Sequence, residues 1–146
     1  MIEVMASSVI AAPVESVWAL VRDFGSIGSW LPGVKSCVLE GDDTGDRVGA
    51  VRRLDMGDVG LIREQLLALS DTEHEVTFSI IESALPLWNY RSTIRLFSVT
   101  DGDRTFICWQ GQFETSPDHA DAMQTRMPVQ IYQPAFDSLA MTLSAR

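Results

Sequence analysis

The sequence predicts an α+β fold in which a seven-stranded antiparallel sheet curls around a long C-terminal helix. Turn sequences rich in Asp and Gly recur along the chain and separate β-type segments of about eight to twelve residues. A helical segment directly follows the first β segment, and the segment 116–146 carries apolar side chains at helical spacing. A sheet buries its apolar face against another layer, and this C-terminal helix can provide that layer.

The first strand is predicted over Ile2–Ala11, and the first helix begins at Pro13. Proline suits the first helical position, and Glu15 suits the positive end of the helix dipole. The Gly-rich segment Phe24–Gly33 is expected to be a connection with one further helical turn. The first helix has one apolar stripe with spacing i, i+3, i+4, i+7, made of Val14, Val17, Trp18 and Val21.

Six more strands are expected at about Val34–Glu40, Arg47–Leu54, Val59–Leu69, Glu75–Glu82, Asn89–Thr100 and Arg104–Glu114. Successive side chains of a strand point to opposite faces, so alternation separates an inner face from a solvent face. The inner face is predicted to carry Ile62, Glu64, Leu66, Ala68, Tyr90, Ser92, Ile94 and Leu96. The solvent face is predicted to carry Arg63, Gln65, Arg91 and Arg95.

Glu64 is a carboxylate on the predicted apolar face. An unpaired buried carboxylate costs several kcal/mol, so Glu64 needs a partner. We expect Arg52 diagonally across the hairpin, within reach of Glu64. Three interpretations are possible. The pair orients the polar group of a ligand, the pair is a structural ion pair, or a bulge turns Glu64 outward. Tyr90 and Ser92 offer hydroxyls on the same face, either for a ligand or for the core.

The C-terminal segment is predicted to be helical, with Ser116 as its cap and Pro117 at its first position. A kink or break is expected at Pro128 and Pro134, because each proline removes a backbone donor and clashes with the preceding turn. The apolar positions of this helix recur every four residues: Met123, Met127, Ile131, Ala135, Leu139 and Leu143.

The composition restricts the class of protein. The 146 residues suit a single domain over 1–146. The net charge of −9 argues against a nucleic acid or an anionic membrane surface as partner. We expect no membrane insertion, because no apolar run approaches ~18 residues, and no signal peptide, because the N-terminus lacks a basic region. With two cysteines and no disulfide framework, a cytoplasmic location is expected.

Several motifs occur in the order found in the START/Bet v 1-like (SRPBCC) superfamily. They are Ala11-Ala12-Pro13-Val14-Glu15-Ser16-Val17-Trp18, Trp30-Leu31-Pro32-Gly33-Val34, Glu40-Gly41, Val48-Gly49-Ala50-Val51-Arg52, Asn89-Tyr90-Arg91-Ser92-Thr93 and Trp109-Gln110-Gly111-Gln112-Phe113. The chain most resembles the polyketide cyclase/dehydrase and lipid-transport branch. The resemblance implies a helix-grip fold with an apolar cavity between sheet and helix, of roughly 300–1,000 Å³. Members bind lipids, hormones or polyketides, and a minority are enzymes.

The chain also resembles plant abscisic-acid receptors. In that resemblance Lys35 corresponds to a cavity lysine, and Glu64, Tyr90 and Ser92 fall on polar pocket positions. Lys35 is therefore a second candidate partner for Glu64. The receptors' Ser-Gly-Leu-Pro gate is replaced here by Met56-Gly57-Asp58-Val59, and their His-Arg-Leu latch by Leu85-Pro86-Leu87. These departures leave the receptors' hormone switch unsupported in this chain.

The orientation of Gln110 is open, because the two arguments conflict. The family pattern puts Gln110 inside, whereas hydrophobicity puts Trp109 inside, and a strand cannot do both without a bulge. We expect Gln110 to reach the cavity. The histidines and cysteines lack metal-ligand spacing, so no metal or cofactor is expected. The candidate ligand-binding residues are Lys35, Arg52, Ile62, Glu64, Leu66, Tyr90, Ser92, Ile94 and Gln110.

Three functions are compatible with these residues. The first is noncatalytic binding of a small hydrophobic ligand, such as a lipid, a polyketide or an aromatic compound. The second is a cyclase/aromatase-type enzyme that uses Glu64 with Tyr90 or Lys35 as acid–base groups. The third is a protein-interaction module or homodimer with a vestigial cavity. We expect the first, because the sequence contains no established catalytic motif.

Overall fold

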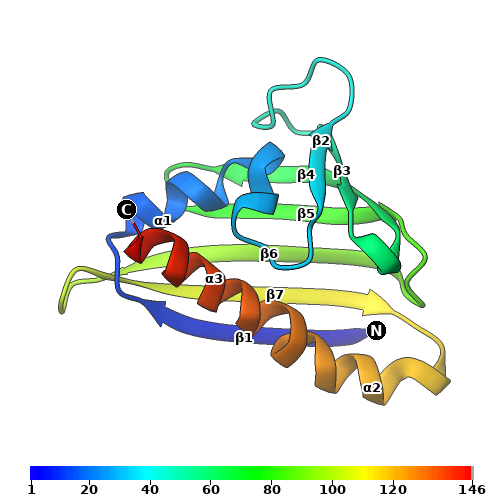
Figure 1. Ribbon diagram of the computed structural model, residues 1–146. Helices are drawn as coiled ribbons and strands as arrows, with labels where there is room; N and C mark the ends of the chain where they lie inside the picture. Colours follow the sequence, from blue (N-terminus) through cyan, green and yellow to red (C-terminus); the bar gives the residue numbers. More distant parts are fainter. Residues whose placement is uncertain (146) are drawn as a thin grey trace.

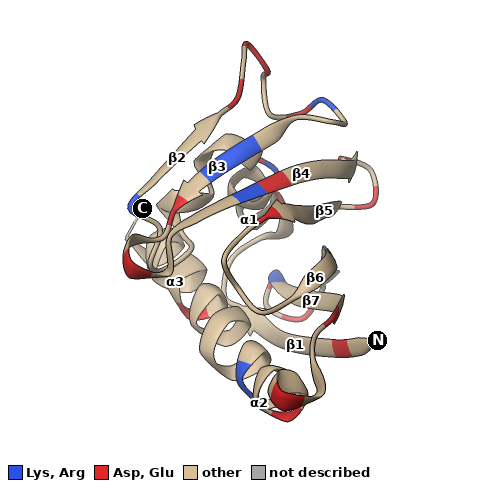
Figure 2. Cartoon of the chain, turned by 90° about the vertical axis from the view of Figure 1, so that its right-hand side faces the viewer, with Lys and Arg blue, Asp and Glu red and all other residues tan. Residues whose placement is uncertain are grey.

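The computed structural model describes residues 1–145 and contains one antiparallel sheet with a long helix across its open side (Figure 1). The strand order in the sheet is β1-β7-β6-β5-β4-β3-β2. The strands are β1 (Ile2–Ile10), β2 (Ser36–Leu39), β3 (Val51–Asp55), β4 (Leu61–Ser70), β5 (Glu75–Glu82), β6 (Trp88–Val99) and β7 (Arg104–Glu114). This arrangement confirms the predicted helix-grip fold. Figure 2 shows how the sheet curls around the C-terminal helix.

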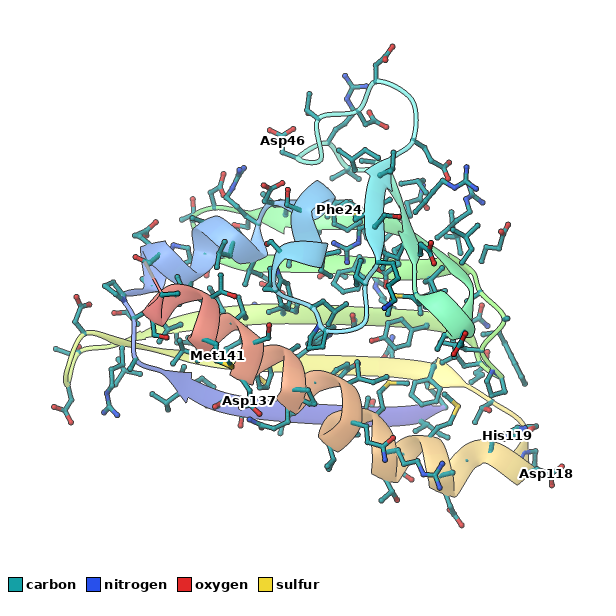
Figure 3. All side chains as sticks on the ribbon, viewed as in Figure 1. Phe24, Asp46, Asp118, His119, Asp137 and Met141 are labelled. Carbon is teal, nitrogen blue, oxygen red and sulfur yellow. The ribbon has the colours of Figure 1, made fainter. Side chains whose placement is uncertain are left out.

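The segment between β1 and β2 is helical, as expected. Helix α1 (Val14–Val21) buries Val17, Trp18 and Val21 against the core. The Gly-rich connection then forms a 3₁₀ helix, η1 (Phe24–Ser29), which buries Phe24 and Ile27. Phe24, labelled in Figure 3, meets Phe78 of β5 edge to face, with 6.2 Å between the ring centres.

The C-terminal helix is continuous, so a break at the prolines is wrong, and the disturbance expected there takes the form of a π-helical turn. It consists of α2 (Pro117–Met127), a π-helical turn η3 (Pro128–Tyr132) and α3 (Gln133–Ser144). In the π turn the Gln133 N–H donates to the Pro128 carbonyl, five residues back. This wider turn accommodates the two prolines.

The π turn also shifts the buried stripe of the helix by one position. One extra residue in the turn places Tyr132 inward in full burial, whereas Ile131 is 42% exposed. The buried positions after the turn are Ala135, Phe136 and Leu139. The predicted four-residue spacing therefore fails at Ile131 and holds again at Ala135 and Leu139. Asp137 and Met141 lie on the outer side of this helix (Figure 3).

The inner face of the sheet follows the predicted alternation with one exception. Ile62, Glu64 and Leu66 are buried on β4, and Tyr90, Ser92, Ile94 and Leu96 are buried on β6. Ala68 is exposed, so its predicted inward orientation is wrong. A register shift between Leu66 and Ala68 inserts one residue, which turns the following side chains to the opposite face.

The connections at the β2 edge are longer than predicted. The strands expected at 34–40 and 47–54 are shortened to β2 and β3, and residues 40–50 form the loop that protrudes above the sheet in Figure 1. The strand expected at 59–69 is preceded by a short 3₁₀ turn, η2 (Gly57–Val59). None of the helices in the described part of the chain is sufficiently long and apolar to cross a bilayer.

Candidate functional site

A small apolar cavity of about 90 Å³ lies between the sheet and the C-terminal helix. Its volume is below the roughly 300–1,000 Å³ expected from the sequence. The sheet contributes Leu54, Ile62, Glu64, Phe78, Ile80, Tyr90 and Trp109 to its wall. The helix contributes Met127, Ile131 and Tyr132, and the connections contribute Ile27, Leu31, Met56, Leu85 and Leu87. Glu64 is the one ionisable group of this wall other than its two tyrosines.

Glu64 is paired with Arg52 inside the core. The two residues lie directly opposite each other on β4 and β3, rather than diagonally as predicted. Arg52 Nε donates to Glu64 Oε1 at 2.8 Å. Arg52 Nη2 lies 2.7 Å from the same oxygen, without the near-linear geometry of a hydrogen bond. Arg52 is 3% exposed and Glu64 7%, so this ion pair is almost entirely removed from water.

Two phenylalanines enclose the Arg52 guanidinium. Its Cζ lies 3.9 Å from the centre of the Phe24 ring and 4.7 Å from the centre of the Phe78 ring. Arg52 Nη1 also donates to the Phe24 carbonyl at 3.0 Å. Arg52 is therefore held behind Glu64 and does not reach the cavity wall. The sequence gives no signal for this role of Phe24, because the residue lies in an irregular Gly-rich segment.

Two tyrosines meet above the middle of β7. Their hydroxyl oxygens are 2.6 Å apart, Tyr90 on β6 and Tyr132 in the π turn. The Tyr132 ring stacks on Trp109, with 4.1 Å between ring centres and 9° between ring planes. Tyr132 is not among the predicted site residues, because the four-residue period points to Ile131. The signal for Tyr132 is an aromatic residue one position beyond the expected inward position, four residues after Pro128.

Burial makes both tyrosines weaker acids than a tyrosine in water. Desolvation raises the pKa of Tyr90 to about 12, against its hydrogen bond with Tyr132, which lowers it. Desolvation also raises the pKa of Tyr132, and its contact with Tyr90 raises it further. The chain has two tyrosines, so these residues account for its entire tyrosinate absorbance.

We predict that alkaline unfolding and tyrosine ionisation coincide. The pKa of an ordinary tyrosine is about 10, whereas folding raises the pKa of Tyr90 to about 12. The protonated tyrosine therefore stabilises the native state fully below pH 10, and this stability is lost as pH rises through about 12. Native protein should therefore show no tyrosinate absorbance at 295 nm at pH 10.5, whereas protein in urea should be largely ionised. Ionisation of a still-folded protein near pH 10 would contradict the buried pair.

Two predicted site residues lie outside the cavity, contrary to expectation. Lys35 is exposed, and it precedes the short edge strand β2, with its stem against Gly57 rather than beside Glu64. Gln110 is exposed on the outer face of the sheet, because the apolar Trp109 occupies the inner side of β7. β7 pairs with both of its neighbours in continuous register around Gln110, so no bulge turns it inward.

The outer face of the sheet carries a hollow of about 530 Å³, and Gln110 belongs to it together with Arg91 and Gln112. This hollow is open to solvent and mostly polar, unlike the inner cavity. Among the other predicted residues, Ile62, Glu64 and Tyr90 line the inner cavity, whereas Leu66, Ser92 and Ile94 are buried without lining it. No group of three His, Cys, Asp or Glu in residues 1–145 could hold a metal ion.

Three further buried polar atoms lack a hydrogen-bond partner within residues 1–145. They are Ser92 Oγ, Trp30 Nε1 and Trp109 Nε1. Buried polar groups normally find a partner, so each atom marks a position where a ligand or a water could supply one. Trp109 is the one of these three residues that lines the cavity.

Comparison with known proteins gives relatives over most of the chain. The abscisic acid receptor PYL10 of Arabidopsis thaliana is 36% identical over 100 residues, which cover 66% of this chain and 53% of the receptor. The matched part of this chain thus spans about half the length of that relative. A solved structure of a Nitrosospira multiformis protein is 32% identical with a TM-score of 0.79, covering 99% of both chains.

Norcoclaurine synthase from Thalictrum flavum shares the fold. Its structure with dopamine and hydroxybenzaldehyde has a TM-score of 0.77 and 15% identity, covering 99% of this chain and 87% of the synthase. The family model described as polyketide cyclase / dehydrase and lipid transport matches residues 1–143. That match covers almost the entire sequence, including every element around the cavity. This chain therefore belongs to the polyketide cyclase / dehydrase and lipid transport family, within the START/Bet v 1-like (SRPBCC) superfamily.

Proposed function

We propose that this protein binds a small, mostly apolar molecule in the cavity between the sheet and the C-terminal helix. The observation that carries the proposal is the composition of the cavity wall. Apolar and aromatic side chains from sheet, helix and connections converge on one small space, and a single carboxylate, Glu64, is placed among them. Such a wall is typical of ligand sites, where a few polar groups orient an apolar molecule.

The cavity must widen to admit a ligand. Its volume of about 90 Å³ is smaller than the ~150 Å³ of an engineered cavity that holds benzene. The movable parts of the wall are Met56 after β3, Leu85 and Leu87 before β6, and Met127 on the helix. Methionine is flexible and adapts to irregular spaces, and the connections are free of the sheet's ladder of hydrogen bonds. We therefore place the entrance at these residues.

The relatives are consistent with this proposal. One is named a receptor for abscisic acid, and another has been solved with dopamine and hydroxybenzaldehyde. Both names concern small organic molecules.

The contacts favour binding over acid–base catalysis. The cyclase alternative needs Glu64 to exchange protons with Tyr90 or Lys35. The Tyr90 hydroxyl is instead bonded to Tyr132, and Lys35 lies outside the cavity. Glu64 has its contacts with Arg52. Glu64 is thus paired with Arg52 through Oε1 and Tyr90 is paired with Tyr132, so no acid–base pair is assembled.

A pair of adjacent substitutions tests the proposal. Ile80 lines the cavity, whereas its neighbour Ile81 is 44% exposed. Ile80→Trp should fill the cavity and weaken binding of the neutral dye N-phenyl-1-naphthylamine at least tenfold, measured by fluorescence titration. It should also cost about 1–3 kcal/mol of stability through overpacking. Ile81→Trp adds the same side chain outside and should leave dye affinity unchanged.

The two variants also give the result that would contradict the proposal. If the dye binds wild type and both variants equally, its site lies elsewhere. If the dye and a panel of small aromatic compounds fail to raise the melting temperature of the wild type, no cavity binding occurs, because a ligand of the native state must stabilise it by mass action.

A further inference from the structure

The cavity wall contains an acceptor without a donor. Both contacts of the Arg52 guanidinium fall on Glu64 Oε1. Within residues 1–145 no donor is hydrogen-bonded to Glu64 Oε2, although the side chain lines the cavity. A carboxylate oxygen can accept two hydrogen bonds, so Oε2 is available to a donor group inside the cavity.

The same wall contains a donor without an acceptor. Trp109 lines the cavity, and its Nε1–H is buried with no partner among the described residues. Indole nitrogen can only donate, so a partner for it must carry an acceptor. A hydroxyl group is the smallest uncharged group that provides both a donor and an acceptor.

The wall offers no cation to an anionic ligand. Arg52 is enclosed by Phe24 and Phe78 behind Glu64, and Lys35 is exposed outside. A ligand carboxylate in the cavity would lose its hydration and meet the negative charge of Glu64. Burial of such an unpaired charge is strongly unfavourable. The charge pattern therefore selects against acids.

Resting on the binding function proposed above, we propose that the preferred occupant is a small neutral phenol, whose hydroxyl donates to Glu64 Oε2. The ring fits a wall that is almost entirely apolar and has aromatic side chains on two sides, with Phe78, Tyr90 and Trp109 on the sheet and Tyr132 on the helix. A ligand with a single ring also requires the cavity to widen least. The site therefore selects ligands that carry a hydrogen-bond donor and no charge.

Four compounds of similar size test this selectivity at pH 7: toluene, 4-methylanisole, 4-methylphenol and 4-methylbenzoate. Toluene has no polar group, methylanisole has an acceptor only, methylphenol has a donor and an acceptor, and methylbenzoate is ionised at this pH. Affinities can be measured by chemical-shift titration. Methylphenol should bind at least about tenfold more tightly than toluene or methylanisole, because a hydrogen bond to a carboxylate is a strong one. Methylbenzoate should bind at least about tenfold more weakly than toluene.

A double substitution assigns the preference to Glu64. Arg52→Met with Glu64→Leu removes the ion pair without leaving a buried charge. This variant should still bind toluene and should lose the preference for methylphenol. The matched control removes an ion pair on the outer face, in which Arg63 Nε lies 2.7 Å from Glu40 Oε2, by the substitutions Arg63→Met and Glu40→Leu. The control should keep the preference.

The outcomes separate the two proposals. If none of the four compounds binds, the binding function itself fails. If toluene binds as tightly as methylphenol, or methylbenzoate binds as tightly as either, the selectivity is overturned while cavity binding stands. A preference for methylphenol that persists in the folded Arg52→Met/Glu64→Leu variant would also overturn the role of Glu64.

Discussion

Glu64→Gln is expected to lower the free energy of unfolding by about 3–5 kcal/mol. The change keeps the size of the side chain and removes its charge. Arg52 is 3% exposed and cannot move to water, because its guanidinium is packed against the rings of Phe24 and Phe78. The substitution therefore leaves a buried cation whose remaining acceptors are neutral, the Phe24 carbonyl and the new amide.

The matched measurements show whether charge or packing is responsible. Arg52→Met/Glu64→Leu removes both charges and should be more stable than Glu64→Gln, although it changes twice as many residues. Glu40→Gln weakens the outer, half-buried pair with Arg63 and should have a much smaller effect, because water reaches and screens that pair. Urea unfolding gives all three values. Equal losses from Glu64→Gln and Glu40→Gln would contradict a buried ion pair.

The pattern of the sheet was accessible from the sequence because strand alternation is a local property. Alternation predicts that Glu64 faces inward with Arg52 of the preceding strand diagonally across from it, and the structure places the two residues directly opposite each other. The register of this hairpin depends on how the chain turns between β3 and β4, where the 3₁₀ turn η2 takes up three residues.

The errors at Ala68 and Ile131 have one physical cause. Each lies beyond a single inserted residue, in a bulge of β4 and in the π turn of the C-terminal helix. In the strand, the inserted residue turns the side chains that follow it to the opposite face of the sheet. In the helix, it moves the inward position from Ile131 to Tyr132. The prolines at 128 and 134 mark the disturbance in the helix, but they do not specify whether it becomes a kink or a wider turn.

The candidate site was less accessible, because it depends on contacts between distant segments. Lys35 and Gln110 were placed in the cavity by resemblance to a family, and both lie outside it. For Gln110 the competing argument from hydrophobicity was correct, since Trp109 gains more from burial than a glutamine does. Phe24 and Tyr132 contribute to the site through a 3₁₀ helix and a π turn, and the regular period of an α-helix gives the orientation of neither.

Gly111→Ala is expected to destabilise the protein by about 2–4 kcal/mol, by overpacking and by disruption of a buried hydrogen bond. Gly111 is buried in β7, and its φ angle is not in the left-handed region, so alanine causes no backbone strain. The effect is steric, because the added Cβ would lie 2.2 Å from the Tyr132 hydroxyl oxygen. Tyr132 cannot withdraw without losing its stacking on Trp109 and its hydrogen bond to Tyr90.

Tyr132→Phe provides the test, because it removes the atom with which the new Cβ collides. Tyr132→Phe alone should cost about 1–3 kcal/mol, since it leaves the buried Tyr90 hydroxyl without its partner. In the Gly111→Ala background the same change should cost less or restore stability, so the double-mutant cycle should show strong favourable coupling. Dye affinity should change across these variants in the same order as stability, because a Tyr132 ring displaced by the new Cβ moves into the cavity that it lines. Additive losses in the cycle would mean that Tyr132 does not rest on Gly111, and the helix would then close the cavity in a different way.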